Sequence, residues 1–153
     1  MDDPLEQVLS LVGTWRGAGR GAYPTITPFG YSEEVTFAAV PGKPFLSYAS
    51  RTRHADDDRP LHAEVGWLRG VGGGRFELVL AQGPGLVEAV EGPGGDGVLD
   101  LVSTLVGGTT TAKPITATRR TYRWSDGELT YEIAMAAVGL DLQHHLTARL
   151  ARV

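Results

Sequence analysis

Apolar and polar residues alternate along most of this chain, and a period of two predicts β-strands rather than helices. In the segment 75–81, Phe76, Leu78 and Leu80 fall on one face and the residues between them fall on the other. Successive side chains of a strand point to opposite faces of a sheet, so such a segment has one face suited to a core. On this basis we predict strands at 13–19, 31–40, 45–53, 61–69, 75–81, 85–91, 97–105, 115–124, 128–138 and 142–151.

A short helix is predicted before the first strand. Asp2 or Asp3 can cap this helix, and Pro4 suits its first position. Apolar residues then recur at helical spacing, at Leu5, Val8, Leu9 and Val12. The strand alternation begins at Gly13, so the helix is expected to end just before it.

Turn-forming residues separate the predicted strands. Clusters of glycine, proline and aspartate lie at 41–44, 56–60, 72–74, 83–85, 92–97 and 125–127. Loops this short join neighbouring antiparallel strands, and closing such a meander removes its unpaired edges. We therefore predict an all-β fold in which residues 1–153 form one domain, a ten-stranded antiparallel up-and-down barrel with a short N-terminal helix. A barrel of this size leaves room for a ligand, and the irregular stretch 107–114 is expected to border its mouth.

The composition argues against several classes of partner. The 153 residues carry a net charge of −4, and lysine occurs only at Lys43 and Lys113, so no nucleic-acid partner is expected. The chain has no cysteine, which excludes disulfides and thiolate metal sites. The N-terminus is acidic, and no segment approaches the roughly 18 apolar residues of a membrane span. We therefore expect no signal peptide, no membrane association and a cytoplasmic location.

Four histidines are the main candidates for metal or acid–base chemistry: His54, His62, His144 and His145. They form no HExxH or His-x-His motif, and no Ser–His–Asp spacing occurs, so zinc hydrolysis has no support. The glycine-rich segment 17–22 lacks the lysine and hydroxyl residue of a phosphate-binding loop. His54 precedes three aspartates and is expected in a solvated loop.

Glycines recur at even spacing in the first predicted strand. Residues 13–24 follow the pattern GxWxGxGxGxYP, which places Gly17, Gly19 and Gly21 on one face. Glycines in phase suggest that something approaches the backbone closely on that face. The pattern resembles the signature of the nitrobindins, small haem-binding β-barrels. The segments PFGYSEEV at 28–35 and LHAEVGWLR at 61–69 resemble later parts of the same family. A Gly-x-Trp step also opens lipocalin-type carriers, where it is a packing motif.

The last predicted strand holds two adjacent histidines, and only one of them can face the barrel interior. Periodicity favours His144, which is in phase with Leu142, Leu146 and Leu150. The resemblance favours His145, because nitrobindins carry the axial haem ligand in a His-Leu step on the final strand. The two indications agree only if Leu146, Ala148 and Leu150 pack outward, under the N-terminal helix or against a second subunit.

The resemblance also implies further haem contacts. The Tyr-Pro-Thr step after the glycines assigns a haem contact to Thr25, although an ordinary turn residue is the alternative. Lys113 corresponds to a loop lysine of the family and could pair with a haem propionate, or it could simply be solvated. His62 could line the pocket beside the haem or could be exposed.

The resemblance to the nitrobindins implies a function as well. One haem b would be held by His145 as five-coordinate ferric iron, with the sixth position open to a small ligand. The implied activities are isomerisation of peroxynitrite to nitrate and reversible binding of nitric oxide. A nitric oxide sensor or transporter is one alternative, and a non-enzymatic carrier of a fatty acid or other apolar ligand is another. Apolar residues on both faces of the last strand suggest a homodimer.

Overall fold

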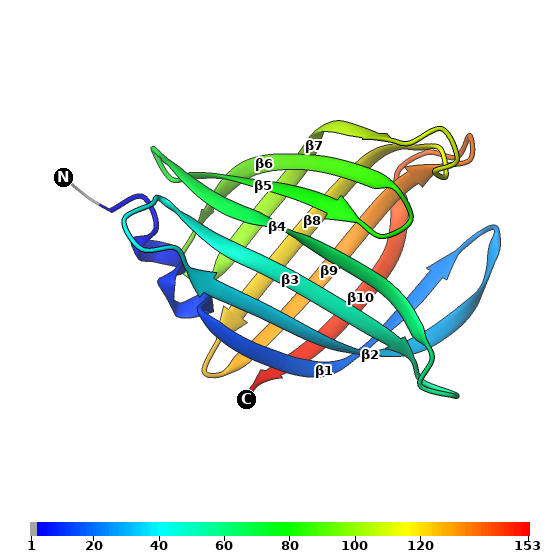
Figure 1. Ribbon diagram of the computed structural model, residues 1–153, viewed down its shortest axis with the longest axis horizontal. Coiled ribbons are helices and arrows are strands. Elements are labelled where there is room, and N and C mark those ends of the chain that lie inside the picture. Colours follow the sequence, from blue (N-terminus) through cyan, green and yellow to red (C-terminus); the bar gives the residue numbers. More distant parts are fainter. Residues whose placement is uncertain (1–2) are drawn as a thin grey trace.

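The computed structural model describes residues 3–153, which form a closed barrel of ten antiparallel strands (Figure 1). Each strand pairs with its neighbours in the chain, and the first pairs with the last to close the ring. The strands are β1 (Gly13–Tyr23), β2 (Ile26–Ala39), β3 (Phe45–His54), β4 (Pro60–Gly72), β5 (Arg75–Gln82), β6 (Leu86–Gly95), β7 (Val98–Gly108), β8 (Ile115–Ser125), β9 (Glu128–Ala137) and β10 (Gln143–Arg152). The predicted all-β barrel and its ten strands are confirmed.

A short helix lies against one end of the barrel, as Figure 1 shows. This helix, η1 (Glu6–Leu11), has 3-10 geometry, and its Val8 and Leu11 are fully buried. The Asp3 carboxylate accepts a hydrogen bond from the Leu5 amide at 2.9 Å, while Asp2 lies outside the described residues. The Trp15 indole donates to the Leu11 carbonyl at 2.9 Å and ties η1 to β1. Within residues 3–153 no helix is long and apolar enough to cross a bilayer.

β1 and β2 are longer than the alternation predicts. Both run to a tight turn at residues 24 and 25, so all the in-phase glycines lie within one strand. A Cβ on Gly19 would overlap the phenol ring of Tyr31, and a Cβ on Gly21 would overlap the ring of Phe29. A Cβ on Gly17 would overlap the backbone of β10. The glycines therefore allow two β2 aromatic rings and the closing strand to lie directly against β1.

β6 also extends beyond its predicted end, through Gly92 and Gly94 to Gly95. The sequence places a turn there, but both glycines sit where a side chain would collide with a neighbouring element. A Cβ on Gly92 would overlap the backbone of β7, and one on Gly94 would overlap the side chains of Leu99 and Phe76. These glycines therefore serve close packing within a strand, and the turn itself falls at residues 96 and 97.

The two halves of the barrel interior differ in character. The half nearest η1 is filled by fully buried apolar side chains, among them Trp15, Leu46, Leu68, Leu99, Leu101, Leu129 and Leu150. The half remote from η1 contains buried charged residues and a cavity. The candidate site therefore lies at the end of the barrel that η1 does not cover.

Candidate functional site

A cavity of about 420 Å³ occupies this second half of the barrel. Its walls combine apolar residues with histidine, carboxylate and tyrosine side chains from most of the strands. The apolar part consists of Phe29, Leu61, Leu86, Val106, Ile115, Ile133, Met135 and Leu146. Concave pockets with mainly apolar walls and a few convergent polar groups are the usual sites of small-molecule and cofactor binding.

His145 lies on the cavity wall because β10 carries a β-bulge at this position. His144 pairs with Ala134 and Leu146 pairs with Ile133, so His145 is an extra residue without a partner on β9. A bulge of this kind shifts the alternation of the strand by one residue. As a result His145 faces inward, and Leu146 also contacts the core on the far side of the bulge.

This arrangement corrects one expectation from the sequence. Agreement between the two histidine indications required Leu146, Ala148 and Leu150 to pack outward. Instead, Ala148 and Leu150 are buried in the barrel core, and Leu146 packs against that core. The bulge removes the conflict without turning these residues outward, because the alternation need not continue across it.

The tautomer of His145 is set by its hydrogen bond to β1. The Nδ1 atom lies 3.1 Å from the Ala22 carbonyl, and a carbonyl can only accept, so Nδ1 carries the proton. The Nε2 atom therefore keeps its lone pair in the neutral ring. Tyr23 holds the imidazole edge-on, with ring centroids 5.6 Å apart. Burial lowers the pKa of His145, which favours this neutral form.

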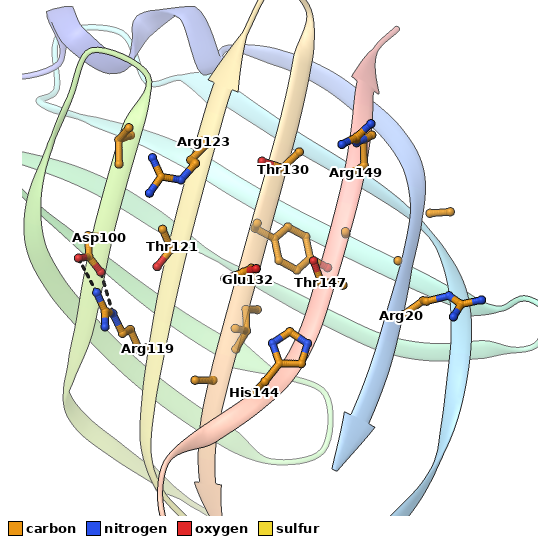
Figure 2. Close-up of a pocket in the computed structure, with 17 residues that line it drawn as sticks. Arg20, Asp100, Arg119, Thr121, Arg123, Thr130, Glu132, His144, Thr147 and Arg149 are labelled. Atoms are coloured by element: carbon orange, nitrogen blue, oxygen red, sulfur yellow. Dashed lines mark hydrogen bonds and ion pairs between the residues drawn. The ribbon is translucent and has the colours of Figure 1, made fainter.

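His144 points the other way, into a groove on the outer surface. Figure 2 shows His144 beside Arg20 and Thr147, on a face formed by strands β1 and β7 to β10. This groove is lined mainly by polar side chains and lies outside the barrel wall. A role for His144 inside the barrel would require its side chain to leave this outer face.

Two further residues singled out from the sequence line the cavity. Lys113 lies exposed in the loop between β7 and β8, at the open end of the barrel. His62 lies on β4 with its side chain 35% exposed, and its Nε2 atom is 3.8 Å from a carboxylate oxygen of Glu64. Thr25 lies exposed in the β1–β2 turn and is not part of the cavity wall, although the neighbouring Tyr23 contacts His145.

The floor of the cavity contains an arginine bound by two glutamates. Arg120 of β8 donates to both oxygens of Glu64 on β4, at 3.0 and 2.9 Å. It also donates to both oxygens of Glu88 on β6, at 2.8 and 2.9 Å. All three side chains are almost completely buried. Burial alone would raise the pKa values of the two carboxyls, but the adjacent guanidinium holds both below their usual range.

A third carboxylate, Glu33 on β2, lies in the cavity wall without an arginine among its hydrogen-bond partners. Its oxygens accept hydrogen bonds from Ser50 and from the Tyr131 hydroxyl, the latter at 2.5 Å. The hydroxyl of Tyr31 lies 2.7 Å from that of Tyr131 and extends the chain. Burial raises the pKa of Glu33, and the hydrogen bonds oppose this only in part.

The sequence analysis did not identify these buried polar residues as part of the site. A usable signal exists, because Glu33 is in phase with Tyr31, Val35 and Phe37 and so shares the inward face of its strand with them. Arg120 is likewise in phase with Tyr122 and with other buried residues of β8. Their pairing carries no such signal, since the partners of Arg120 lie 32 and 56 residues away in the sequence.

These residues fit a haem group. Among the cavity-lining residues, His145 presents a neutral imidazole whose Nδ1 is already bound to the backbone, which leaves Nε2 for a metal. Apolar walls suit the porphyrin faces, and the exposed Lys113 suits a propionate. No group of three or more His, Cys, Asp or Glu side chains within residues 3–153 is arranged to hold a bare metal ion.

Comparison with known proteins agrees with this fit. Residues 4–152 match the family described as "THAP4-like, heme-binding beta-barrel domain". The chain is 51% identical over 152 residues to "Peroxynitrite isomerase 2" of Mycobacterium ulcerans (strain Agy99), covering 97% of this chain and 94% of that one. It is 47% identical over 146 residues to "Peroxynitrite isomerase" of Nocardia farcinica (strain IFM 10152), covering 93% of this chain and 86% of that one.

A solved structure shares the fold over the whole chain. The crystal structure of Rv2717c from M. tuberculosis superimposes with a TM-score of 0.92 at 44% sequence identity, covering 100% of this chain and 99% of the other. The family match spans almost the entire barrel, including the glycine strand and the histidine pair. The chain therefore belongs to the family of THAP4-like haem-binding β-barrel domains, the nitrobindins.

Proposed function

We propose that this protein binds one haem b through His145 and isomerises peroxynitrite to nitrate. The observation that carries the proposal is the inward imidazole of His145, fixed by the Ala22 carbonyl so that its Nε2 lone pair is available. The relatives in Mycobacterium ulcerans and Nocardia farcinica carry the name of this activity. Bound haem would supply a ferric Lewis acid with one coordination position open to peroxynitrite or nitric oxide.

The protein's own residues have distinct tasks in this proposal. His145 holds the iron as a neutral ligand, and Tyr23 keeps its ring in place. Lys113 pairs with a propionate at the mouth, and His62 lines the pocket beside the porphyrin. Thr25 makes its contact from the β1–β2 turn, at the rim rather than inside the cavity. The apolar walls exclude water and confine reactive fragments.

The ligand assignment is tested by adding hemin to the purified protein and recording the Soret band. His145→Ala should abolish stable haem binding. His144→Ala is the matched control, because it removes the same side chain from the outer face of the same strand. Loss of the Soret band in His144→Ala, with His145→Ala unaffected, would overturn the assignment.

The activity is tested by stopped-flow measurement of peroxynitrite decay together with the nitrate share of the products. The ferric holo-protein should accelerate decay and raise the nitrate share, and cyanide should suppress both effects by occupying the open position. Apo-protein and His145→Ala mixed with hemin control for protein alone and for free hemin. Decay equal to that in buffer, with a haem-loaded and folded sample, would refute the isomerase activity and leave nitric oxide binding to be measured.

A carrier of fatty acids receives less support from the cavity. Its apolar walls end on a floor that carries Arg120, Glu64 and Glu88, and beyond this floor the interior is filled by the core. An acyl chain that entered from the mouth would terminate against charged groups, which is unfavourable. Displacement of a fluorescent fatty acid by hemin distinguishes the two ligands, because a carrier would bind the fatty acid more tightly than hemin.

We also propose that the protein forms a homodimer, through a face other than β10. The outer face of β10 is polar, with His144 and Arg149 exposed. Exposed apolar side chains instead cover the outside of β4 to β7: Val65, Trp67, Val71, Val79, Val87, Val102 and Leu105. Trp67 pairs with Val79, which pairs with Ala89, which pairs with Leu105, so one apolar row crosses all four strands.

The size of this apolar face suits a second copy of the chain. Four strands about 4.8 Å apart and a length of about 20 Å give roughly 400 Å². This is about half of the ~800 Å² that each partner buries in a stable interface, and a polar rim supplies the rest. Sedimentation should show a dimer for the wild type and a monomer for Trp67→Glu. A monomeric wild type at high concentration would refute the dimer.

A further inference from the structure

The hydrogen-bonded chain formed by Tyr31, Tyr131 and Glu33 has no task in holding haem. Tyr31 and Tyr131 are joined at 2.7 Å, and Tyr131 donates to Glu33 at 2.5 Å. All three residues are buried, and all three line the cavity. The Ser50 hydroxyl donates to the other oxygen of Glu33. With two hydroxyls directed at it, the carboxylate acts as the acceptor at the end of the chain.

A second tyrosine–carboxylate pair in the same barrel provides a comparison. Tyr48 donates to Glu64 at 2.8 Å, but both oxygens of Glu64 also accept from Arg120. The guanidinium stabilises the charge of Glu64 and makes it a weak base. Glu33 has no such partner, and burial raises its pKa, so it is the stronger proton acceptor. Tyr48 is also absent from the cavity wall.

Proton acceptance matters because a buried phenol is not readily oxidised alone. Burial raises the pKa of Tyr131 far above its usual value, so the phenolate is not accessible near neutral pH. Removal of one electron from the neutral phenol leaves a strongly acidic radical cation. Oxidation is therefore favoured only where a base in hydrogen-bond contact accepts the phenolic proton at the same time. Among the five tyrosines, Tyr131 meets this condition best.

We propose that Tyr131, with Glu33 as proton acceptor, is a one-electron donor that reduces nitrogen dioxide in the cavity. The phenolic O–H bond of Tyr131 breaks, its electron passes to the nitrogen dioxide radical to give nitrite, and its proton passes to the Glu33 carboxylate. The products are a neutral tyrosyl radical, nitrite and a carboxylic acid. The oxidant is the one-electron fragment of peroxynitrite, so the biological setting, although not the step itself, rests on the function proposed above.

The glycine strand supports the geometry of this chain. The ring of Tyr31 occupies the space that a side chain on Gly19 would fill, and this places its hydroxyl against Tyr131. The Tyr31 ring also packs against Phe29, with ring centroids 6.0 Å apart. Because its hydroxyl is hydrogen-bonded to that of Tyr131, Tyr31 can give one electron and its phenolic proton to the Tyr131 radical, which restores the Tyr131 phenol and leaves the radical on Tyr31. The strand pattern that identifies the family thus also positions this pair of phenols.

The wild-type chain without haem provides the first test. Nitrogen dioxide is generated by radiolysis of nitrite, and peptide mass spectrometry then locates 3-nitrotyrosine, which forms when a second nitrogen dioxide adds to a tyrosyl radical. All five tyrosines are between 2% and 6% exposed, so exposure alone predicts no preference. We expect nitration at Tyr131 or Tyr31. Equal nitration of all five tyrosines, or oxidation confined to the exposed Trp67, would overturn the proposal.

Variants then distinguish loss of the proton acceptor from a general disturbance of the fold. Glu33→Gln should reduce the yield of tyrosyl radical and abolish the slowing of its formation in deuterium oxide, whereas Tyr48→Phe should change neither. Tyr131→Phe, which removes a single oxygen, provides the same test if Glu33→Gln fails to fold by circular dichroism. An unchanged radical yield in folded Glu33→Gln or Tyr131→Phe would refute the proposal. Because haem is absent, failure here is distinct from failure of the isomerase function.

Discussion

Replacement of Arg120 by methionine is expected to destabilise the barrel strongly. The change removes a buried cation that makes four hydrogen bonds to the carboxylates of Glu64 and Glu88. Removal of one partner from a buried ion pair costs about 3–5 kcal/mol, because it leaves an uncompensated charge. For a domain of this size each kcal/mol lowers Tm by about 2–4 °C, which corresponds to a fall of roughly 6–20 °C.

The neighbouring residue provides a matched control. Arg119 makes the same two-point contact with a carboxylate, donating to Asp100 at 2.9 and 2.7 Å. Its side chain is 50% exposed, and Figure 2 shows the pair on the outer face of the barrel. Water and salt screen such exposed pairs, so Arg119→Met should leave Tm almost unchanged. The two variants compare the same residue type, on the same strand, inside and outside the wall.

The pH dependence gives a second check on the same reasoning. In the wild type, Arg120 lowers the pKa values of Glu64 and Glu88, so their contribution to stability is present above about pH 4.3 and is lost as the pH falls. In Arg120→Met the hydrogen bonds from Tyr48 to Glu64 and from Thr118 to Glu88 remain, but burial is the larger effect and raises both pKa values, so stability is lost as the pH rises. The difference in unfolding free energy between wild type and variant should therefore increase from acidic to neutral pH.

Urea denaturation at acidic and neutral pH, followed by circular dichroism, measures these differences. The expected result for Arg120→Met is a large loss of unfolding free energy that grows with pH. For Arg119→Met almost no loss is expected. Equal losses for the two variants would show that burial of the ion pair is unimportant. A loss for Arg120→Met that does not vary with pH would show that packing, rather than the uncompensated carboxylates, is responsible.

Three other predictions concern packing and the haem ligand. Gly19→Val should destabilise the barrel by about 1–3 kcal/mol, because its side chain would overlap Tyr31. Gly30→Ala, whose methyl group meets only ordinary contacts, should not, and urea denaturation compares the two variants. Acidification should release haem as His145 takes up a proton and loses its lone pair, which loss of the Soret band would follow; haem retained in a folded protein after protonation would contradict this ligand. Tyr23→Phe should cost about 1–3 kcal/mol by urea denaturation, since its hydroxyl satisfies two buried backbone groups of β9, and an unchanged midpoint would argue against that role.

The strands could be predicted from the sequence because their inward faces are regular. Alternation over 75–81 and over 128–138 corresponds closely to β5 and β9, and the short loops between strands led to the barrel topology. The ends of strands were harder to predict. In β6, glycine and proline indicate a turn, but two of the glycines are needed for close packing. Which requirement a glycine serves depends on its neighbours across the sheet.

The candidate site was less accessible to sequence reasoning. Periodicity alone selected His144, because the bulge at His145 arises from the pairing of β10 with β9 and leaves no local sign. Only the family resemblance pointed to His145. The buried charges were missed for a related reason. Glu33 and Arg120 occupy inward-facing positions of their strands, but their roles depend on hydrogen-bond partners that lie on other strands.

The bulge at His145 also separates barrel closure from ligand binding. The pairing of β1 with β10 extends from Trp15 and Arg152 to Gly21 and Leu146, and it ends just before the bulge. Beyond that point the Ala22 carbonyl accepts from the imidazole rather than from a strand partner. The segment that bears the ligand is therefore paired with β9 alone, beyond the end of the seam that closes the barrel. Residues 143 and 144 can change sequence, and the bulge can adjust to a bound ligand, without altering the β1–β10 pairing that closes the ring, so affinity and barrel closure can evolve independently.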